Sequence, residues 1–188
     1  LEIAAEKMVS DAGAKPAFKG YYVPAVGQTY KYVLCTSVNE EIVHGLPSAK
    51  RILKKGDIVS IDTGAQLNGY FGDSAITVGV GEISPRAQRL LQVTEEALER
   101  AIDKVRAGNR LFDICSAVEH HVRSNGFSIV REYVGHGIGT KLHEEPQIPN
   151  YVDKRNENPR IKEGMVFAIE PMVNAGAADS KIGLDKWT

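Results

Sequence analysis

The segment from Asp57 to Val78, DIVSIDTGAQLNGYFGDSAITV, decides the fold. Its residues alternate toward strands on both sides of Asn68-Gly69, the dipeptide that most strongly favours a two-residue hairpin turn. This turn pairs Leu67 with Tyr70 and Asp62 with Ala75 across the two strands. Asp73 is then the diagonal neighbour of Asp62 on the same face, at about 7–8 Å. The segment therefore predicts a hairpin that brings two carboxylates together.

These two carboxylates are the first candidate site. Two like charges on one strongly β-forming face repel each other and resist burial, and a divalent metal relieves both costs. Asp62 and Asp73 are therefore candidate metal ligands. Two alternatives stay open at this point: one Asp faces solvent, or a bulge at Gly64 or Gly72 changes the register.

A weak internal repeat supplies a third carboxylate. Residues 53–62 read LKKGDIVSID and residues 161–170 read IKEGMVFAIE, so that each copy ends with a carboxylate six residues beyond its glycine. A duplicated half-domain would place Asp62 and Glu170 on symmetry-related strands facing one cleft. Glu170 also interrupts an apolar run, and charged side chains are rarely buried unless they are paired or ligating. It is a candidate metal ligand, with a salt bridge to Arg or Lys as the alternative.

Histidines complete the candidate set. His136 lies in Gly135-His136-Gly137-Ile138-Gly139, where the glycines let the backbone approach a site closely, and neutral imidazole is the commonest metal ligand. His143, seven residues later, can serve as a proton donor. His44 is a weaker signal. An oxygen-rich set with one nitrogen suits Mn, Fe(II), Co or Zn and water activation, and nucleophile elbows and phosphate loops are missing from the sequence, so we expect metal-assisted hydrolysis.

The rest of the chain indicates an α+β domain. Apolar residues recur at helical spacing over 85–106 and 111–124, and polar residues predict a loop over 146–160. Strands are expected at 32–36, 58–61, 70–78, 128–131 and 165–173. The 188 residues carry a net charge of −1, which argues against a nucleic-acid partner, and no apolar run approaches the roughly 20 residues of a membrane span. Two cysteines without metal-ligand spacing favour a reducing, cytoplasmic setting.

Together these motifs resemble the bacterial-type methionine aminopeptidases. The segments that carry the resemblance are 39–47, 57–64, Gly72-Asp73, 135–139, 143–146 and 169–172. The resemblance implies an α+β pita-bread fold with two pseudo-symmetric halves and an antiparallel sheet covered by helices on one side. It also implies one catalytic-type domain over 1–188, which removes N-terminal methionine from nascent proteins and peptides.

The resemblance also assigns roles to residues. Asp62 would chelate one metal, Asp73 would bridge two, and His136 and Glu170 would hold the other. His143 would hydrogen-bond the scissile peptide, and His44 would shuttle a proton beside the substrate's amino end. The implied methionine pocket consists of Tyr21, Cys35, His44, Leu142 and Trp187, although the family often has an aromatic residue at the position of Leu142. The implied cofactors are two divalent ions (Co, Mn, Fe(II) or Zn), and the implied setting is a cytoplasmic monomer that meets nascent chains at the ribosome.

The ends of the sequence add one further expectation. It begins inside a helical pattern and stops at Lys186-Trp187-Thr188, which is typical of a strand cut short. The family's fifth ligand is a Glu after the Trp-Thr pair, so we expect 1–188, taken alone, to be incomplete at both ends and to bind one metal tightly at best. The alternatives are a catalytically silent domain that binds protein termini and a related Xaa-Pro-cleaving enzyme, which would carry different residues around the His motifs.

Overall fold

The computed structural model describes residues 1–24 and 26–188. The chain divides into two compact units. Unit 1 comprises Leu1–Ile83, Gly139–Leu142 and Lys181–Thr188, and unit 2 comprises Ser84–Ile138 and His143–Ser180. None of the described helices is long and apolar enough to cross a membrane.

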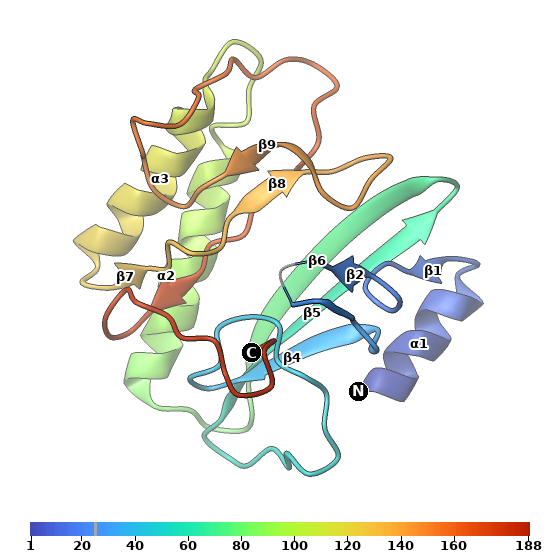
Figure 1. The fold of residues 1–188 in the computed structure, drawn as a ribbon. Helices are drawn as coiled ribbons and strands as arrows, with labels where there is room; N and C mark the ends of the chain where they lie inside the picture. Colours follow the sequence, from blue (N-terminus) through green and yellow to red (C-terminus); the bar gives the residue numbers. More distant parts are fainter. Residues whose placement is uncertain (25) are drawn as a thin grey trace. The chain divides into compact units, whose positions relative to one another are not determined.

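Unit 1 is built around one long strand (Figure 1). Its elements are α1 (Glu2–Asp11), β1 (Lys15–Pro16), β2 (Tyr22–Val23), β3 (Gln28–Thr29), β4 (Leu34–Val38), β5 (Ile58–Leu67) and β6 (Tyr70–Gly79). β6 pairs with β5 along its whole length, whereas β4 and β1 pair with successive stretches of β5. All of these pairs are antiparallel, and β2 and β3 form a separate small ribbon. β5 is therefore the strand to which the rest of the sheet is attached.

The predicted hairpin is confirmed, including its register. Leu67 pairs with Tyr70 and Asp62 pairs with Ala75, without any shift along the ladder. Asn68 and Gly69 have φ values of +52° and +85°, the left-handed conformation that a two-residue turn of this kind requires. The alternative of a bulge at Gly64 or Gly72 is wrong, because both glycines take regular places in the ladder.

Unit 2 contains two helices and two small sheets. Its elements are α2 (Pro85–Ile102), α3 (Leu111–Ser124), β7 (Ser128–Ile129), β8 (Gly135–Gly137), β9 (Glu144–Ile148), β10 (Phe167–Ala168) and β11 (Val173–Asn174). β8 lies between β10 and β9, and β11 pairs with β7. As predicted, Ser84 caps α2 by accepting a hydrogen bond from Ala87, with Pro85 in the first turn. β8 is the strand on which His136 lies.

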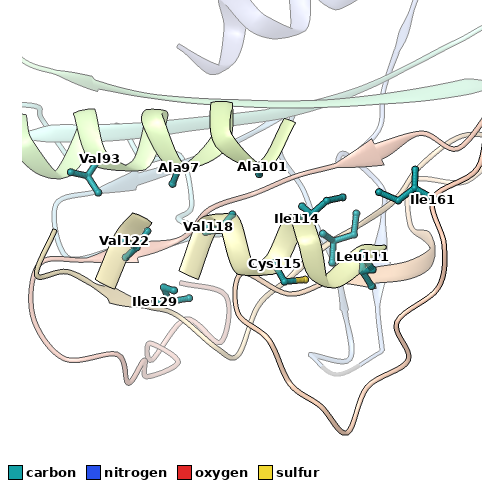
Figure 2. Packing of buried hydrophobic residues seen from close by; sticks show 11 residues of the cluster. Val93, Ala97, Ala101, Leu111, Ile114, Cys115, Val118, Val122, Ile129 and Ile161 are labelled. Carbon is teal, nitrogen blue, oxygen red and sulfur yellow. The ribbon is translucent and has the colours of Figure 1, made fainter. Parts of the chain in front are cut away.

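The core of unit 2 confirms the apolar face predicted over 111–124, and confirms in part the one predicted over 85–106, where Ala97 and Ala101 are buried but Ile102 is 54% exposed (Figure 2). The buried cluster consists of Val93, Ala97 and Ala101 from α2, Leu111, Ile114, Cys115, Val118 and Val122 from α3, and Ile129, Ile148 and Ile161. Alanines on α2 let the two helices approach closely, while larger side chains on α3 fill the space. This packing holds α3 against the strands that follow it.

Several boundaries differ from the sequence predictions, and the largest difference is in β5, which was predicted over 58–61 and extends to Leu67. α2 ends at Ile102 rather than 106, because the amides of Lys104 and Val105 bond three residues back and the chain then turns at Gly108, where φ is +95°. The strand predicted at 32–36 is observed at 34–38, and β9 begins before and enters the stretch predicted as a loop. The strand predicted at 128–131 shortens to β7, of two residues.

Two further strand predictions are wrong. The expected strand 165–173 is reduced to β10 and β11, because Pro171 lacks an amide hydrogen and interrupts the run between them. Lys186-Trp187-Thr188 is not a strand but part of a turn, since the carboxylate of Asp185 accepts hydrogen bonds from the amides of Trp187 and Thr188. That turn sets the backbone from which the Trp187 side chain projects.

Candidate metal centre and substrate pocket

The two carboxylates of the hairpin lie beside a buried thiol in unit 1. Asp62 and Asp73 are partly buried, and Cys35 on β4 is directly opposite Asp62. The pKa of Cys35 is raised to about 12, mainly by burial and in smaller part by the charges of Asp62 and Asp73, against the lowering effect of a hydrogen bond with Tyr30. Cys35 pairs with Asp62, and Asp73 pairs with Gly64, two residues from Asp62, so the two carboxylates and Cys35 share one face of the sheet.

Tyr30 is a residue of this face that sequence reasoning missed. Its side chain is buried, its ring meets that of Trp187 edge-on at 5.0 Å, and its hydroxyl donates to the Leu34 carbonyl at 2.9 Å. Burial raises the pKa of Tyr30 well above its usual range. Tyr30 thus connects Trp187 with the strand that carries Cys35. In the sequence, Tyr30 is one of several tyrosines between residues 21 and 32, and no spacing distinguishes it from the others.

Two other predicted pocket residues belong to the same unit. The amide of Tyr30 donates to the Tyr21 carbonyl at 2.8 Å, which places Tyr21 beside the Tyr30 backbone. Leu142 is buried, and its short segment is tied to β6 because the Phe71 amide donates to the Gly139 carbonyl at 2.8 Å. Unit 1 therefore holds every residue predicted for the pocket.

His44 lies on a loop pressed against β4. Its φ of +60° is a left-handed conformation that is uncommon for a non-glycine residue and is often retained at functional sites. The loop packs so tightly that a Cβ at Gly45 would lie 2.3 Å from the Thr36 carbonyl oxygen. The Thr36 amide also donates to the Gly45 carbonyl at 2.8 Å. The loop thus fixes His44 close to the strand that carries Cys35.

Unit 2 brings together His136, His143 and Glu170. The buried His136 has Nδ1 2.8 Å from the Gly137 carbonyl oxygen, so Nδ1 carries the proton because a carbonyl only accepts. Its Nε2 is then the ring nitrogen that could accept a metal ion, and it lies 3.3 Å from Glu170 Oε1. The ring of His143 meets that of His136 edge-on, with centroids 4.4 Å apart.

The glycines beside His136 are needed for close contact with the backbones of neighbouring strands, whereas the sequence predicted close approach to a site. A Cβ at Gly135 would lie 2.3 Å from the Ala168 carbonyl oxygen, and one at Gly137 would lie 2.3 Å from the Glu145 carbonyl oxygen. Neither backbone atom can move without disturbing β10 or β9. The two glycines therefore let β8 lie tightly between its neighbours and hold the His136 backbone in place.

Glu170 has the properties of a ligand rather than of a salt-bridge partner. Its Oε1 is buried and makes no hydrogen bond within the described part of the chain, and its 3.3 Å separation from His136 is an ion pair only if the imidazole is protonated. The expected alternative, a pair with Arg or Lys, does not occur among residues 1–24 and 26–188. A buried carboxylate oxygen that accepts no hydrogen bond destabilises the fold unless a cation binds it. This oxygen beside an imidazole nitrogen fits a divalent metal.

Asn150 is a second residue that the sequence did not reveal. It is 2% exposed, and its side-chain amide donates to the Glu170 backbone carbonyl at 2.7 Å. Asn150 therefore fixes the backbone from which the Glu170 carboxylate extends.

The predicted ligands occur as pairs, with Asp62 and Asp73 in unit 1 and His136 and Glu170 in unit 2. Within the part of the chain that the structure describes, no three His, Cys, Asp or Glu side chains form a group able to hold a metal ion.

Comparison with known proteins gives consistent matches over the whole chain. Residues 2–185 match metallopeptidase family M24. The chain is 51% identical to methionine aminopeptidase 1 of Bacillus subtilis over 188 residues, which is all of this chain and 73% of that protein. It is 48% identical to the methionine aminopeptidase of Aquifex aeolicus over 189 residues, again covering all of this chain and 73% of that protein.

Solved structures agree with these relatives. The crystal structure of methionine aminopeptidase from Thermotoga maritima matches with a TM-score of 0.92 at 45% identity, covering 99% of this chain and 72% of that chain. Prolidase from Pyrococcus furiosus matches less well, with a TM-score of 0.73 at 28% identity over 90% of this chain and 46% of that chain. Both identity and structural fit are higher for the aminopeptidase than for this prolidase.

Proposed function

Because this chain belongs to metallopeptidase family M24, among its methionine aminopeptidases, we propose that it removes N-terminal methionine from peptides and nascent proteins. The predicted α+β pita-bread class is confirmed by the structural matches. The alternative of a catalytically silent domain is not favoured, since a binding module has no physical need for paired, partly buried carboxylates.

We assign the metal ligands to the two pairs of residues described above. Asp62 and Asp73 supply carboxylate oxygens, and His136 and Glu170 supply one nitrogen and further oxygen. This mixed donor set suits divalent ions of the Mn, Fe(II), Co or Zn type. Bound there, divalent ions supply Lewis acidity, which polarises a peptide carbonyl and makes water a stronger nucleophile.

The two remaining histidines handle protons and hydrogen bonds. His143, edge-on to His136, donates a hydrogen bond to the oxygen of the scissile peptide as negative charge develops there. His44, fixed beside β4, takes and returns a proton at the substrate's amino end, since imidazole titrates near neutral pH.

We place the methionine side chain against Tyr21, Cys35, Leu142 and Trp187 of unit 1. Cys35 and Leu142 are buried, Trp187 is partly buried, and Tyr21 is 39% exposed. Aromatic rings and a neutral thiol form surroundings that suit a flexible, polarisable thioether. The raised pKa of Cys35 supports this role, because the thiol stays uncharged at neutral pH.

The setting follows from the reaction. We infer that the protein acts in the cytoplasm as a monomer, meets nascent chains at the ribosome, and has no nucleic-acid or membrane partner of its own. The free thiols of Cys35 and Cys115 fit a reducing compartment, and the net charge of −1 gives no general attraction to nucleic acid.

The observation that carries the proposal is the buried Glu170 oxygen beside His136 Nε2. The test is release of methionine from a Met-Ala-Ser peptide by metal-free protein to which Mn or Co is added back. Wild type should release methionine, whereas Glu170→Gln and Asp62→Asn should lose release by about a hundredfold or more. Glu163→Gln, which removes an exposed carboxylate from the same segment, is the matched control and should keep full activity.

Two results would count against the proposal. If Glu170→Gln releases methionine as fast as wild type, Glu170 is not a ligand. If wild type releases no methionine with any divalent metal, the result favours the binding-only alternative instead.

A further inference from the structure

Helix α1 contributes little to the core of unit 1. None of its side chains is buried, and Leu1, Ile3 and Met8 are largely exposed. Hydrophobic burial therefore does not explain what the helix does there. Two carboxylates of the helix connect it to the rest of the unit. Glu6 pairs with Lys19 at 2.5 Å on the surface, and Glu2 accepts a hydrogen bond from the Val33 amide.

Glu2 holds two successive backbone amides at the start of β4. Its Oε1 accepts from the Val33 amide at 2.6 Å, and its Oε2 accepts from the Leu34 amide at 3.0 Å. Val33 is 0% exposed and Leu34 is 3% exposed. Hydrogen bonds to an ionised acceptor are stronger than neutral ones, and buried amides left without a partner are costly. Both oxygens of one carboxylate thus fix the first residues of a buried strand.

The residue that follows this contact is Cys35. It lies directly opposite Asp62 on β5, so a shift of β4 at Leu34 would move the thiol relative to the carboxylate. The Leu34 carbonyl also accepts the Tyr30 hydroxyl, so the same residue ties Glu2 to the ring that packs on Trp187. After burial, the charge of Glu2 is among the causes that raise the pKa values of Tyr30 and Cys35, which supports its closeness to both.

We propose that Glu2 is a positioning residue for methionine specificity: by holding the Val33 and Leu34 amides, it fixes the pocket residue Cys35 and also Tyr30, which packs on the pocket residue Trp187. This inference rests on the proposed pocket. Glu2 does not touch the reacting atoms, so its loss should weaken substrate binding and leave the chemical step largely unchanged.

The test compares Glu2→Gln and Glu2→Ala with Glu6→Gln, which removes a carboxylate and an ion pair from the same helix without touching β4. Four quantities are measured: hydrogen exchange of the Val33 and Leu34 amides, the rate at which a small disulfide reagent modifies Cys35, and KM and kcat for a Met-Ala-Ser peptide. Cys115, buried in unit 2, reports on unfolding in the same reaction. Glu2→Gln keeps the side-chain length and one acceptor oxygen, so it decides the question if Glu2→Ala does not fold.

In the Glu2 variants, we expect the two amides to exchange roughly ten- to a hundredfold faster, from the loss of charge-assisted hydrogen bonds. Cys35 modification should accelerate about tenfold while Cys115 does not, and KM should rise about tenfold with kcat within twofold. Glu6→Gln should match wild type in every readout. Wild-type exchange and Cys35 rates in Glu2→Gln would overturn the proposal.

Two other results would also overturn it. Equal acceleration of Cys115 would show that Glu2 supports overall stability, and an unchanged KM despite faster exchange would show a purely structural role. Exchange and thiol modification need neither substrate nor metal. These two measurements therefore test the contact between Glu2 and the Val33 and Leu34 amides even if the protein does not have the proposed aminopeptidase activity.

Discussion

The two copies of the internal repeat, residues 53–62 and 161–170, start with the same turn and then diverge. In the first copy, the Asp57 amide donates to the Lys54 carbonyl at 3.1 Å, and in the second, the Met165 amide donates to the Lys162 carbonyl at 3.3 Å. The glycines between them, Gly56 and Gly164, have φ values of +98° and +84°. The repeated sequence therefore encodes one local backbone shape twice.

After the turn, the two copies form very different strands. The first continues into β5, ten residues long and paired on both edges, so that Asp62 lies within a ladder. The second continues into β10, two residues long and paired with β8, so that Glu170 lies beyond the strand and is held by Asn150 instead. The repeat specifies the turn and the distance to a carboxylate, whereas the neighbouring segments decide how that carboxylate is fixed.

The largest expected effect tests the tight packing beside the second copy. In Gly135→Ala, the new methyl would meet the Ala168 carbonyl oxygen at 2.3 Å, so β8 and β10 cannot keep their pairing. We expect a loss of about 3 kcal/mol or more in the free energy of unfolding, measured by urea denaturation. The matched control on the hairpin is Gly72→Ala, whose methyl meets nothing within 4 Å and should change stability by less than about 1 kcal/mol. Equal losses in the two variants would show that close packing does not distinguish the copies.

The next effect concerns the side chain that fixes Glu170. Asn150→Ala leaves the Glu170 carbonyl without its 2.7 Å donor in a buried position, which should cost about 1–3 kcal/mol. If Asn150 orients a ligand, calorimetric titration of metal-free protein should also show metal affinity falling by about 10- to 100-fold. An Asn150→Ala protein that loses stability but binds metal as well as wild type would restrict Asn150 to a structural role.

A more modest effect tests whether the turns at Gly56 and Gly164 are alike in energy as well as in geometry. A Cβ at Gly56 or at Gly164 would meet nothing within 4 Å, so Gly56→Ala and Gly164→Ala should pay only the cost of a left-handed backbone. That cost is about 1–2 kcal/mol, and thermal unfolding should show it to be equal in both variants and additive in the double variant. A clear inequality would mean that the turns are alike in geometry but not in energy.

Local patterns were the part of the fold that the sequence could predict. Asn68-Gly69 predicted the hairpin register, and Ser84-Pro85 predicted the start of α2, because neighbouring residues alone determine those shapes. The strand expected over 165–173 was wrong, since an apolar run says nothing about how many residues find a partner strand. Spacing singled out Asp62 and Glu170 as candidate ligands, but Tyr30 and Asn150 act through contacts with distant segments that no local pattern encodes.

The smallest expected effect lies at the residue after each glycine, Asp57 or Met165. Its side chain accepts a hydrogen bond from a lysine amide in both copies, but the acceptor atom differs. The Lys54 amide donates to Asp57 Oδ2 at 2.8 Å, and the Lys162 amide donates to Met165 Sδ at 3.4 Å. Hydrogen bonds from Asn39 and from the Lys54 amide lower the pKa of Asp57 below its usual 3.8. Because the folded pKa is the lower one, Asp57 stabilises the fold above about pH 3.8 and loses that effect as pH falls through the folded pKa.

Asp57→Asn should therefore be slightly less stable than wild type at pH 6, and the difference should vanish toward pH 2 in parallel urea titrations. Met165→Leu, which removes only a weak sulfur acceptor, should show no such pH dependence, and a pH-independent difference for Asp57→Asn would mean that the charge of Asp57 does not matter to its turn.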